Sequence, residues 1–448
     1  MKNQEMKEGK IVPLLIKFST PAVIGMLVNA IYNVVDRIFI GNAPDLGALG
    51  LAGATVSYPV MLVLIALSLM SGVGGSTRFS IALGAGNKEE AKQYLANSFI
   101  ISILVGILFM LFGNLFLNQI LQILGASNQS LPYAREYLSI ILYGAVFQCI
   151  AMWGNNFSRA QGNPKNAMIS QLIGAGFNIL FDYIFIYIFD MGMAGAAWAT
   201  IGGQFLSCIW QLNFIFGRKS IVQLRLKEIK IKLHYVKTIC STGIPALLMQ
   251  LANSTQIMVL NGTVASLGGD VAVSTVGVIT SFQSILTMPI MGICQGQQPL
   301  ISYNYGAKLI DRVYETYRNA VIGATIFAIV GYVCILTFPE AIIRLFSSDT
   351  AIIELGVQAM KIWFMASFLI GYQVVCANYF QAVGRIKAAS FYNLIRQFLF
   401  LIPIMLILSK IFGLFGVFYA VVASDVLATL VTFIAMKKEV KALKTQFK

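Results

Sequence analysis

Long apolar runs alternate with short polar or Gly/Pro-containing breaks along almost the whole chain. Each run is long enough to form a helix that crosses the roughly 30 Å hydrocarbon core of a bilayer. The pattern predicts twelve membrane-spanning helices, near residues 12–40, 50–82, 93–118, 134–160, 167–189, 194–217, 235–265, 271–303, 314–339, 355–382, 389–410 and 414–436. We therefore expect an all-α integral membrane protein without a separate soluble domain.

The two halves of the chain resemble each other at a spacing of 220 to 224 residues. The segment "TPAV" at 20–23 returns as "IPAL" at 244–247, and "SRAQGNPKNA" at 158–167 returns as "FQAVGRIKAA" at 380–389. Because each half holds six helices, both copies begin on the same side of the membrane, which makes a parallel repeat. We expect two six-helix bundles facing each other across a central cleft. The predicted division is an N-terminal bundle over 1–217, a cytoplasmic linker over 218–234 and a C-terminal bundle over 235–448.

The composition and charge agree with this reading. The chain is 58% hydrophobic and 11% charged, about half the charged fraction of a soluble domain. The net charge is +14, and we assign 27 of the 32 Lys and Arg residues to the N-terminus, the even-numbered connections and the C-terminus. This asymmetry predicts that both termini and the linker are cytoplasmic. Topology thus accounts for the positive charge, and we expect no nucleic-acid partner.

Three carboxylates, Asp36, Asp182 and Asp425, fall inside predicted spans. A charge in the hydrocarbon core costs about 2.5 to 3.5 kcal/mol on insertion scales, so such acids usually face a bundle interior or a cavity. Asp425 has no evident partner on its own helix face. The other two acids have polar neighbours at helical spacing.

We expect Asp36 and Asp182 to meet at one polar centre. Asn178 lies four residues before Asp182, and Ala196 lies four residues before Thr200, so each pair shares a helix face. With a rise of about 1.5 Å per residue, Asp36, Asp182 and Thr200 reach similar depths in the outer half of the membrane. An all-oxygen centre without a basic partner suits a shared proton or a small hard cation such as Na⁺.

The second half lacks these acids, because Leu260 stands opposite Asp36 and Ile404 stands opposite Asp182 in the repeat. Cation chemistry is therefore expected in the N-terminal bundle alone. The polar residues that we expect to line the cargo cleft are uncharged amides: Asn33, Gln250, Asn253, Gln256 and Gln283.

Three segments and the doubled six-helix pattern resemble the multidrug and toxic compound extrusion (MATE) family, in its MepA- and DinF-like bacterial branch. The segments are "VVDRIFIG" in the first span, "RAQGNPK" after the fourth and "FNILFDYIFI" in the fifth. The resemblance covers about residues 10 to 440. It implies a secondary active transporter in a bacterial cytoplasmic membrane, and we expect this transporter to be monomeric, although nothing in the sequence determines its oligomeric state. Such a transporter exports cationic or amphipathic drugs in exchange for H⁺ or Na⁺ by alternating access.

The resemblance also implies which residues bind the coupling ion, and it implies neither an enzymatic activity nor a cofactor besides that ion. The implied cation-coupling set is Asp36, Asn178, Asp182, Thr200, the carbonyl of Ala196, and Asn155 of the fourth span, with Asn156 beside it.

Other functions compete with this one. A lipid-linked oligosaccharide flippase of the same superfamily needs cationic residues in its cavity to hold a pyrophosphate. Basic residues are nearly absent from the predicted spans, which favours cationic cargo. An intramembrane enzyme needs clustered nucleophiles or metal ligands, and a channel needs a selectivity filter. Neither pattern stands out.

Overall fold

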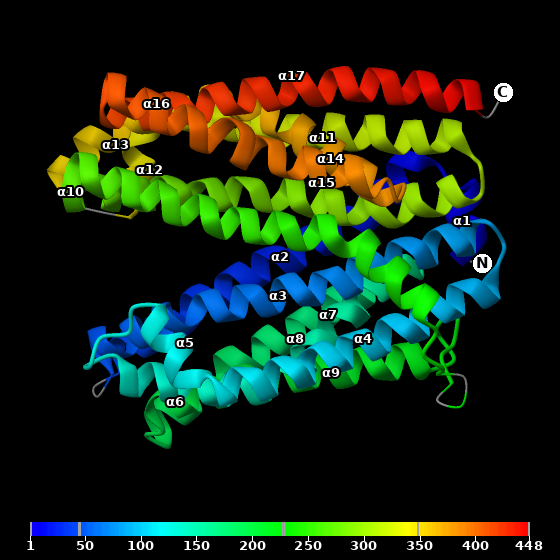
Figure 1. Ribbon diagram of the computed structural model, residues 1–448, viewed down its shortest axis with the longest axis horizontal. Coiled ribbons are helices and arrows are strands. Elements are labelled where there is room, and N and C mark those ends of the chain that lie inside the picture. The colour runs from blue at the N-terminus through cyan, green and yellow to red at the C-terminus, as the bar shows by residue number, and fades with distance from the viewer. Residues whose placement is uncertain (1, 44–45, 226, 228, 347–348, 447–448) are drawn as a thin grey trace. The chain divides into compact units, whose positions relative to one another are not determined.

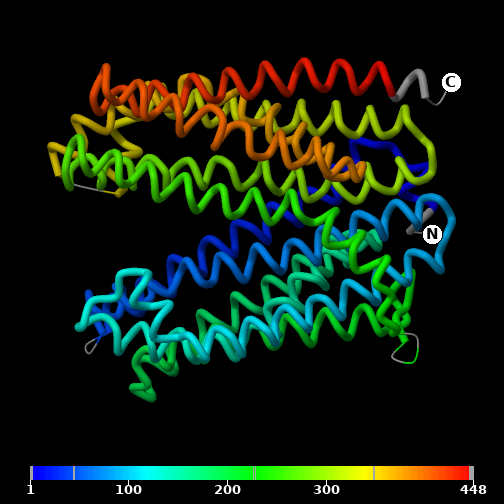
Figure 2. The backbone as a smooth tube through the Cα atoms, in the orientation of Figure 1, coloured from blue at the N-terminus to red at the C-terminus, as the bar shows by residue number. Residues whose placement is uncertain are grey.

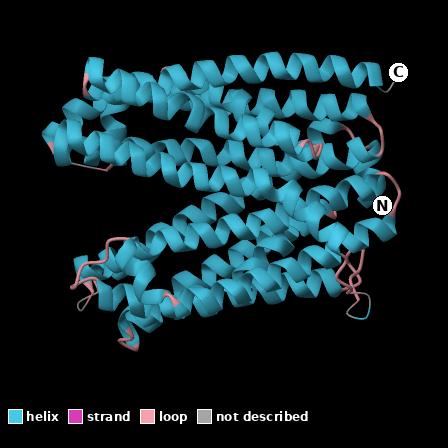
Figure 3. Cartoon of the chain, in the orientation of Figure 1, coloured by secondary structure: helices cyan, strands magenta, loops and turns pink. Residues whose placement is uncertain are grey.

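The computed structural model describes residues 2–43, 46–225, 227, 229–346 and 349–446. Helices and the turns between them make up this part of the chain, and it contains no strand (Figure 3). The all-α prediction is confirmed. Residues 226 and 228 of the predicted linker lie outside the described residues, as do residue 1 and residues 447–448 at the termini.

The chain divides into two compact units, which we describe separately. The first unit contains Met1–Gly9 and Ile24–Leu247, and the second contains Lys10–Val23 and Leu248–Lys448. Two helices therefore pass from one unit into the other: α2 (Ile11–Asn42) and α10 (Leu233–Gly306). Pro21 and its repeat partner Pro245 each lie two residues before the crossover. Proline lacks a backbone N–H and removes one helical hydrogen bond, which loosens a helix at such a point.

The first unit is a bundle built around α3, which packs against α4, α6 and α7. Helix α7 also packs against α9, and α9 packs along α8, as the neighbouring ribbons show (Figure 1). Besides α2 and α10, its elements are α1 (Lys2–Glu8), α3 (Gly47–Gly84), α4 (Lys88–Leu115), α5 (Leu117–Ile123), α6 (Leu131–Tyr143), α7 (Ala145–Ala160), α8 (Pro164–Tyr183), the π-helix η1 (Ile184–Ile188) and α9 (Gly192–Phe216).

The second unit repeats this scheme, with α16 packed on α17 and α11 on α14. Its backbone can be followed from green to red (Figure 2). After α10 its elements are α11 (Ile310–Thr337), α12 (Pro339–Arg344), α13 (Thr350–Trp363), the 3-10 helix η3 (Ser367–Leu369), α14 (Ile370–Ala382), α15 (Ile386–Leu394), the π-helix η4 (Ile395–Leu401), α16 (Ile402–Phe412) and α17 (Leu414–Gln446).

The helices are consistent with the twelve predicted spans. Eight helices of the described chain are long and apolar enough to cross a membrane, and two bent pairs bring the number to ten. One of the eight, α10, covers both the seventh and the eighth predicted span. It is interrupted at Gly269, whose φ of 59° suits glycine rather than a residue with a side chain. Helix α9 occupies the sixth predicted range.

Two predicted spans are bent rather than straight. The fourth span consists of α6 and α7, which meet at 53°, and the tenth consists of α13 and the η3–α14 segment, which meet at 46°. The two bends occupy the same place in the repeat. Sequence periodicity predicted both spans but did not predict their bends.

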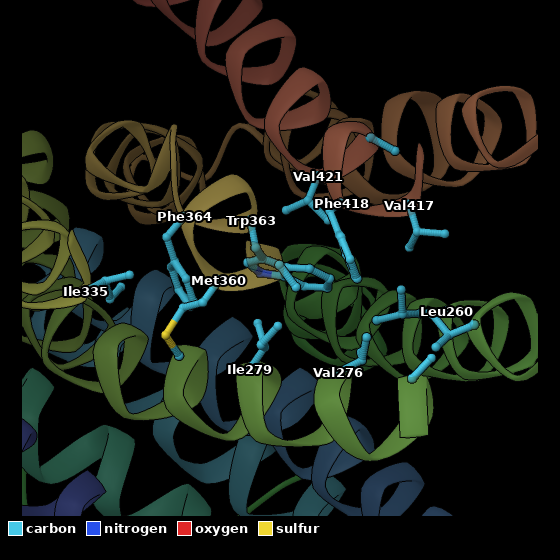
Figure 4. Packing of buried hydrophobic residues seen from close by; sticks show 14 of the residues in the cluster. Leu260, Val276, Ile279, Ile335, Met360, Trp363, Phe364, Val417, Phe418 and Val421 are labelled. Carbon is cyan, nitrogen blue, oxygen red and sulfur yellow. The ribbon is translucent and has the colours of Figure 1, made fainter. Parts of the chain in front are cut away.

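An apolar cluster forms the core of the second unit at its α13–α17 end. Trp363 and Phe418 lie side by side in it, with ring centroids 6.2 Å apart, and Leu260 and Val421 pack into the same cluster (Figure 4). Leu260 is only 2% exposed. Between membrane-spanning helices, such a residue stabilises the bundle through close packing rather than through removal from water.

Candidate cation-binding site

A close approach of α8 and α9 assembles the polar centre of the first unit. A Cβ atom added at Gly203 of α9 would lie 2.5 Å from the carbonyl oxygen of Gly174 on α8, so glycine is required there. One turn beyond this contact, the amide of Asn178 donates from Nδ2 to Thr200 Oγ1 at 3.2 Å and to Asp182 Oδ1 at 3.4 Å. The structure therefore brings Asn178, Asp182 and Thr200 together, as expected.

Asp36 of α2 completes the centre. Its carboxyl group lies close enough to that of Asp182 for the two groups to interact electrostatically. Two such carboxyl groups can form a hydrogen bond with each other only when one of them carries a proton, because an ionised carboxylate only accepts. Asp182 is fully buried, at 0% exposure, and Asp36 is partly buried.

Three oxygen atoms of this centre have no hydrogen-bond partner within the described part of the chain: Asp36 Oδ1, Asp182 Oδ2 and Asn178 Oδ1. Buried polar atoms are normally paired, so a group of unpaired oxygens requires an explanation. All three atoms can accept a hydrogen bond or coordinate a hard cation. Because the unpaired atoms are all acceptors and two of them belong to acids, the arrangement fits a cation rather than an anion.

Among the described residues, no basic side chain forms an ion pair with Asp36 or Asp182. Arg37, next to Asp36 in sequence, extends over the ring of Tyr58, with its guanidinium carbon 5.6 Å from the ring centroid. Consecutive helical residues point about 100° apart, which explains why Arg37 and Asp36 diverge. The two carboxyl groups therefore depend on a proton or on a bound cation for neutralisation.

Two tyrosines that were not predicted from the sequence also belong to this centre. Tyr137 of α6 is buried, lies close to Thr200 and is within electrostatic range of both acids. Tyr32 lies one turn before Asp36 on α2 and is also close to both acids. The four-residue spacing of Tyr32 and Asp36 could have predicted that the two side chains share a helix face. Nothing in the local sequence pointed to Tyr137.

The backbone beside Asp182 is irregular. The π-helix η1 begins at Ile184, two residues after Asp182. Single π-helical turns inside α-helices occur frequently at functional sites, because the extra residue displaces side chains and frees backbone groups. Ala196 of the predicted set lies one turn before Thr200, fully buried in an apolar cluster with Ile40. This cluster lowers the dielectric on one side of the centre.

Asn155 is not brought to the centre. Its Oδ1 accepts a hydrogen bond of 2.6 Å from Gln211, which also accepts hydrogen bonds from Ser158 and Asn166. Gln211 lies eleven residues beyond Thr200 on α9, about 16 Å along the helix. Asn155 thus belongs to a separate polar network, and its role in ion coupling stays a prediction.

The amides predicted to line a cargo cleft have varied partners. Asn33 donates to the Asn29 carbonyl, Gln283 accepts from Trp363 at 3.2 Å, and Asn253 accepts from Gln397. Gln250 and Gln256 are partly buried. Their common function as cleft residues stays a prediction.

Asp425, for which the sequence offered no partner on its own helix face, accepts a hydrogen bond of 2.5 Å from Arg396 Nε of another helix, in an ion pair. Arg396 lies in the helix that occupies the eleventh predicted span, 389–410. This span therefore contains a base, and a neighbouring acid neutralises it.

Comparison with known proteins agrees with the geometry. The MatE family model matches residues 21–184 and again residues 245–407, once in each half, as the predicted repeat requires. The multidrug export protein MepA of Staphylococcus aureus (strain MRSA252) is 28% identical over 435 residues, covering 96% of this chain and 95% of that protein. MepA of Staphylococcus haemolyticus (strain JCSC1435) is 29% identical over 444 residues, covering 97% and 95%.

Solved structures share the same fold. A crystal structure of MATE in the bent conformation has a TM-score of 0.94 and 25% sequence identity, and covers 100% of this chain and 99% of that chain. A crystal structure of MATE in the straight conformation has a TM-score of 0.92 and 25% identity, and covers 99% of both chains.

Proposed function

Because the chain belongs to the MATE family, we propose that it is a secondary active transporter that exports drugs across the membrane in exchange for a coupling ion. The similarity to proteins named multidrug export protein over nearly the full chain supports this proposal. The role is transport rather than catalysis.

The observation that carries the proposal is the pair of adjacent carboxyl groups of Asp36 and Asp182, which have no basic partner in the described chain. Two negative charges about 4 Å apart repel each other by roughly 4 kcal/mol even at an effective dielectric constant of 20. A bound proton or cation removes this repulsion. The centre with a bound proton or cation therefore favours a different packing of α2 against α8 from the centre without one.

Such a centre couples ion movement to conformation only if its ion affinity differs between two conformations. We propose that Asp36 and Asp182 hold the ion tightly in the conformation with adjacent carboxyl groups and weakly when α2 moves away. Cationic cargo then competes for the same negative charge, and the released ion travels in the opposite direction.

We propose H⁺ as the principal ion and Na⁺ as an alternative occupant of the same centre. The closeness of the carboxyl groups of Asp36 and Asp182 favours a proton, which the two groups can share. The unpaired oxygens together with the Thr200 hydroxyl supply the ligand type that Na⁺ requires. In this proposal the carbonyl of Ala196 is a further oxygen ligand, and Asn155 acts from the neighbouring network.

The cargo class follows from the charges of the centre. Acids without a basic partner attract cationic and amphipathic molecules, and the amides expected in the cleft add hydrogen bonds without charge. We further propose that the protein functions as a monomer in a bacterial cytoplasmic membrane with both termini in the cytoplasm, because the basic connections lie on that side.

The flippase alternative has no observation in its favour. A pyrophosphate-binding cavity requires uncompensated cationic side chains. Arg396, the basic residue found in the eleventh span, is already paired with Asp425.

The test uses wild-type protein reconstituted in proteoliposomes that contain dansylcadaverine, a cationic dye. We expect export when an H⁺ gradient is imposed opposite to the direction of export, with weaker export under a Na⁺ gradient. An ionophore that collapses the gradient should reduce dye export to the level measured with dye-filled liposomes that lack the protein. Export that persists without any gradient would refute ion-coupled transport.

A further inference from the structure

The segment that joins the two halves of the chain ends in an exposed mixture of basic and apolar side chains. Residues 229–233, which we call the linker end, read Ile-Lys-Ile-Lys-Leu and lead into α10. Ile231 is 64% exposed and Leu233 is 79% exposed, and Lys230 and Lys232 are exposed as well. One exposed apolar residue is ordinary, but two that alternate with lysines indicate a surface that another molecule covers.

Contacts with α4 hold the linker end in place within the first unit. The backbone N–H of Lys232 donates to Asn97 Oδ1 at 2.8 Å. Just beyond it, the ring of Tyr235 meets the ring of Tyr94 edge to face, with centroids 4.9 Å apart. Asn97 is fully buried and Tyr94 nearly so, which makes both of them fixed points of α4. The linker end therefore lies along the flank of α4.

These contacts place the linker end at the edge of the predicted hydrocarbon region. Asn97 lies nine residues after Lys88, the first residue of α4, which is about 14 Å along the helix. The third predicted span begins near residue 93, one turn before Asn97. The linker starts at the end of α7, where Gln161 accepts a hydrogen bond of 3.0 Å from the backbone N–H of Val222. The linker thus runs from the end of the bundle to the boundary between headgroups and acyl chains.

We propose that the linker end is a binding surface for anionic lipid headgroups of the leaflet in which α10 begins. Ile231 and Leu233 enter the upper acyl region, and the ammonium groups of Lys230 and Lys232 extend back to the lipid phosphates. The rest of the linker adds to the attraction, because residues 217–237 contain seven Lys and Arg residues and one acid. This inference goes beyond the proposed transport function and does not depend on it.

The combination of side chains selects an anionic membrane surface over other partners. A headgroup without net charge, such as phosphatidylcholine, gives the two lysines little attraction, whereas one lysine near an anionic surface raises affinity about fivefold. A nucleic acid would bind the lysines through its phosphates but would leave Ile231 and Leu233 in water. Topology explains why basic residues lie on this side of the membrane, but it does not explain two exposed apolar residues among them.

The test titrates the purified full-length protein in a zwitterionic detergent with dioleoylphosphatidylglycerol. Hydrogen exchange of the peptide that covers the linker end is followed by mass spectrometry. We expect exchange to slow as the anionic lipid is added and to stay unchanged with dioleoylphosphatidylcholine. Lys230→Gln/Lys232→Gln should raise the half-saturating lipid concentration about 25-fold, from two lysines at about fivefold each. Both side chains are exposed and the backbone bond to Asn97 remains, so this variant should fold.

A second variant separates the apolar contribution from the charges. Ile231→Ser/Leu233→Ser should also weaken binding, and the protection that remains should disappear at high salt, because only screened charge attraction is left. The matched control is Lys437→Gln/Lys438→Gln, which removes the same charge from two exposed lysines near the end of α17. The control should leave the half-saturating concentration at the linker end unchanged.

Three results would overturn the inference. Equal protection by the two lipids would show that headgroup charge is not recognised. An unchanged titration in both linker-end variants would show that these side chains do not bind the lipid. Protection by a short RNA without lipid, lost in the lysine variant but kept in the Ile231/Leu233 variant, would identify a nucleic-acid surface instead. None of these measurements uses dye export, so a failure of the proposed transport function would be seen separately.

Discussion

The two halves of the chain place acids and aliphatic residues, respectively, at the same two helix positions of the repeat. Asp36 and Asp182 lie at the polar centre of the first unit. Their repeat partners are Leu260, which is buried in the apolar cluster of the second unit (Figure 4), and Ile404, which packs against that cluster. The fold therefore accepts either carboxyl groups or aliphatic side chains at these positions. The acids are not needed to build a six-helix bundle, which indicates that they are kept for function.

The second unit also contains a buried acid, and this acid is neutralised by a base. Asp425 is as buried as Asp182, but Arg396 neutralises it without any bound ion. Asp182 faces another acid instead. A buried acid with a base beside it requires no ion, whereas two acids without a base require a cation. Both centres lie at π-helical segments, η1 and η4, where the regular hydrogen bonding of the helix is altered.

The largest effect on stability is expected where one partner of the compensated pair is removed. Asp425→Asn leaves the Arg396 charge buried and unpaired, and should reduce the free energy of unfolding by about 3 to 5 kcal/mol. Thermal unfolding of the purified protein in detergent measures this. The control is Glu340→Gln, which breaks the exposed pair with Arg344 and should change stability by less than about 1 kcal/mol. Equal effects of the two changes would show that Asp425 is not held by a buried pair.

The next effect compares one repeat position in both halves. Leu260→Ala opens a cavity in the apolar cluster and should destabilise the protein by about 2 to 5 kcal/mol. Asp36→Asn removes one of two neighbouring acids that have no ion-pair partner, so it should leave stability unchanged or raise it slightly. The same unfolding assay checks both variants. A large loss of stability in Asp36→Asn would mean that this carboxyl group is structural and would remove the contrast between the halves.

A smaller effect is expected from Tyr137→Phe. The substitution removes the hydroxyl that lies close to Thr200 and keeps the buried ring. One hydrogen bond from this hydroxyl to the centre would contribute about 0.5 to 1.5 kcal/mol, so the affinity for the coupling ion should fall about twofold to tenfold. The half-saturating ion concentration for dye export measures the change. The matched control is Tyr133→Phe on the same helix, which should behave as wild type.

Local spacing explains which parts of the site the sequence predicted. Asn178 and Asp182 share a face because they lie four residues apart, and the depth of Asp36 and Thr200 follows from counting residues along helices. These four residues do meet. The helix positions were predicted for the same reason, since each span is defined by its own apolar run.

Contacts between distant helices explain what the sequence did not predict. Tyr137 reaches the centre from α6, about forty residues before Asn178, and no periodic pattern encodes that packing. Arg396 and Asp425 are 29 residues apart on different helices. Arg396 was visible inside an apolar span, and a search for an acid opposite it could have found the pair. The partners of Asn155 became clear only with the packing of α7 against α9.

The most direct test of the central claim is Asp182→Asn in proteoliposomes, because asparagine has nearly the same shape but cannot carry the titratable negative charge. We predict a folded, inserted protein that no longer couples an H⁺ or Na⁺ gradient to dansylcadaverine export. Asp36→Asn should lose coupling likewise, and the double variant should be little worse, because both acids form one centre. Asp190→Asn, at the exposed end of the same span, is the control and should transport as wild type. Normal gradient-driven export by Asp182→Asn would contradict the account and reduce Asp182 to a structural hydrogen-bonding group.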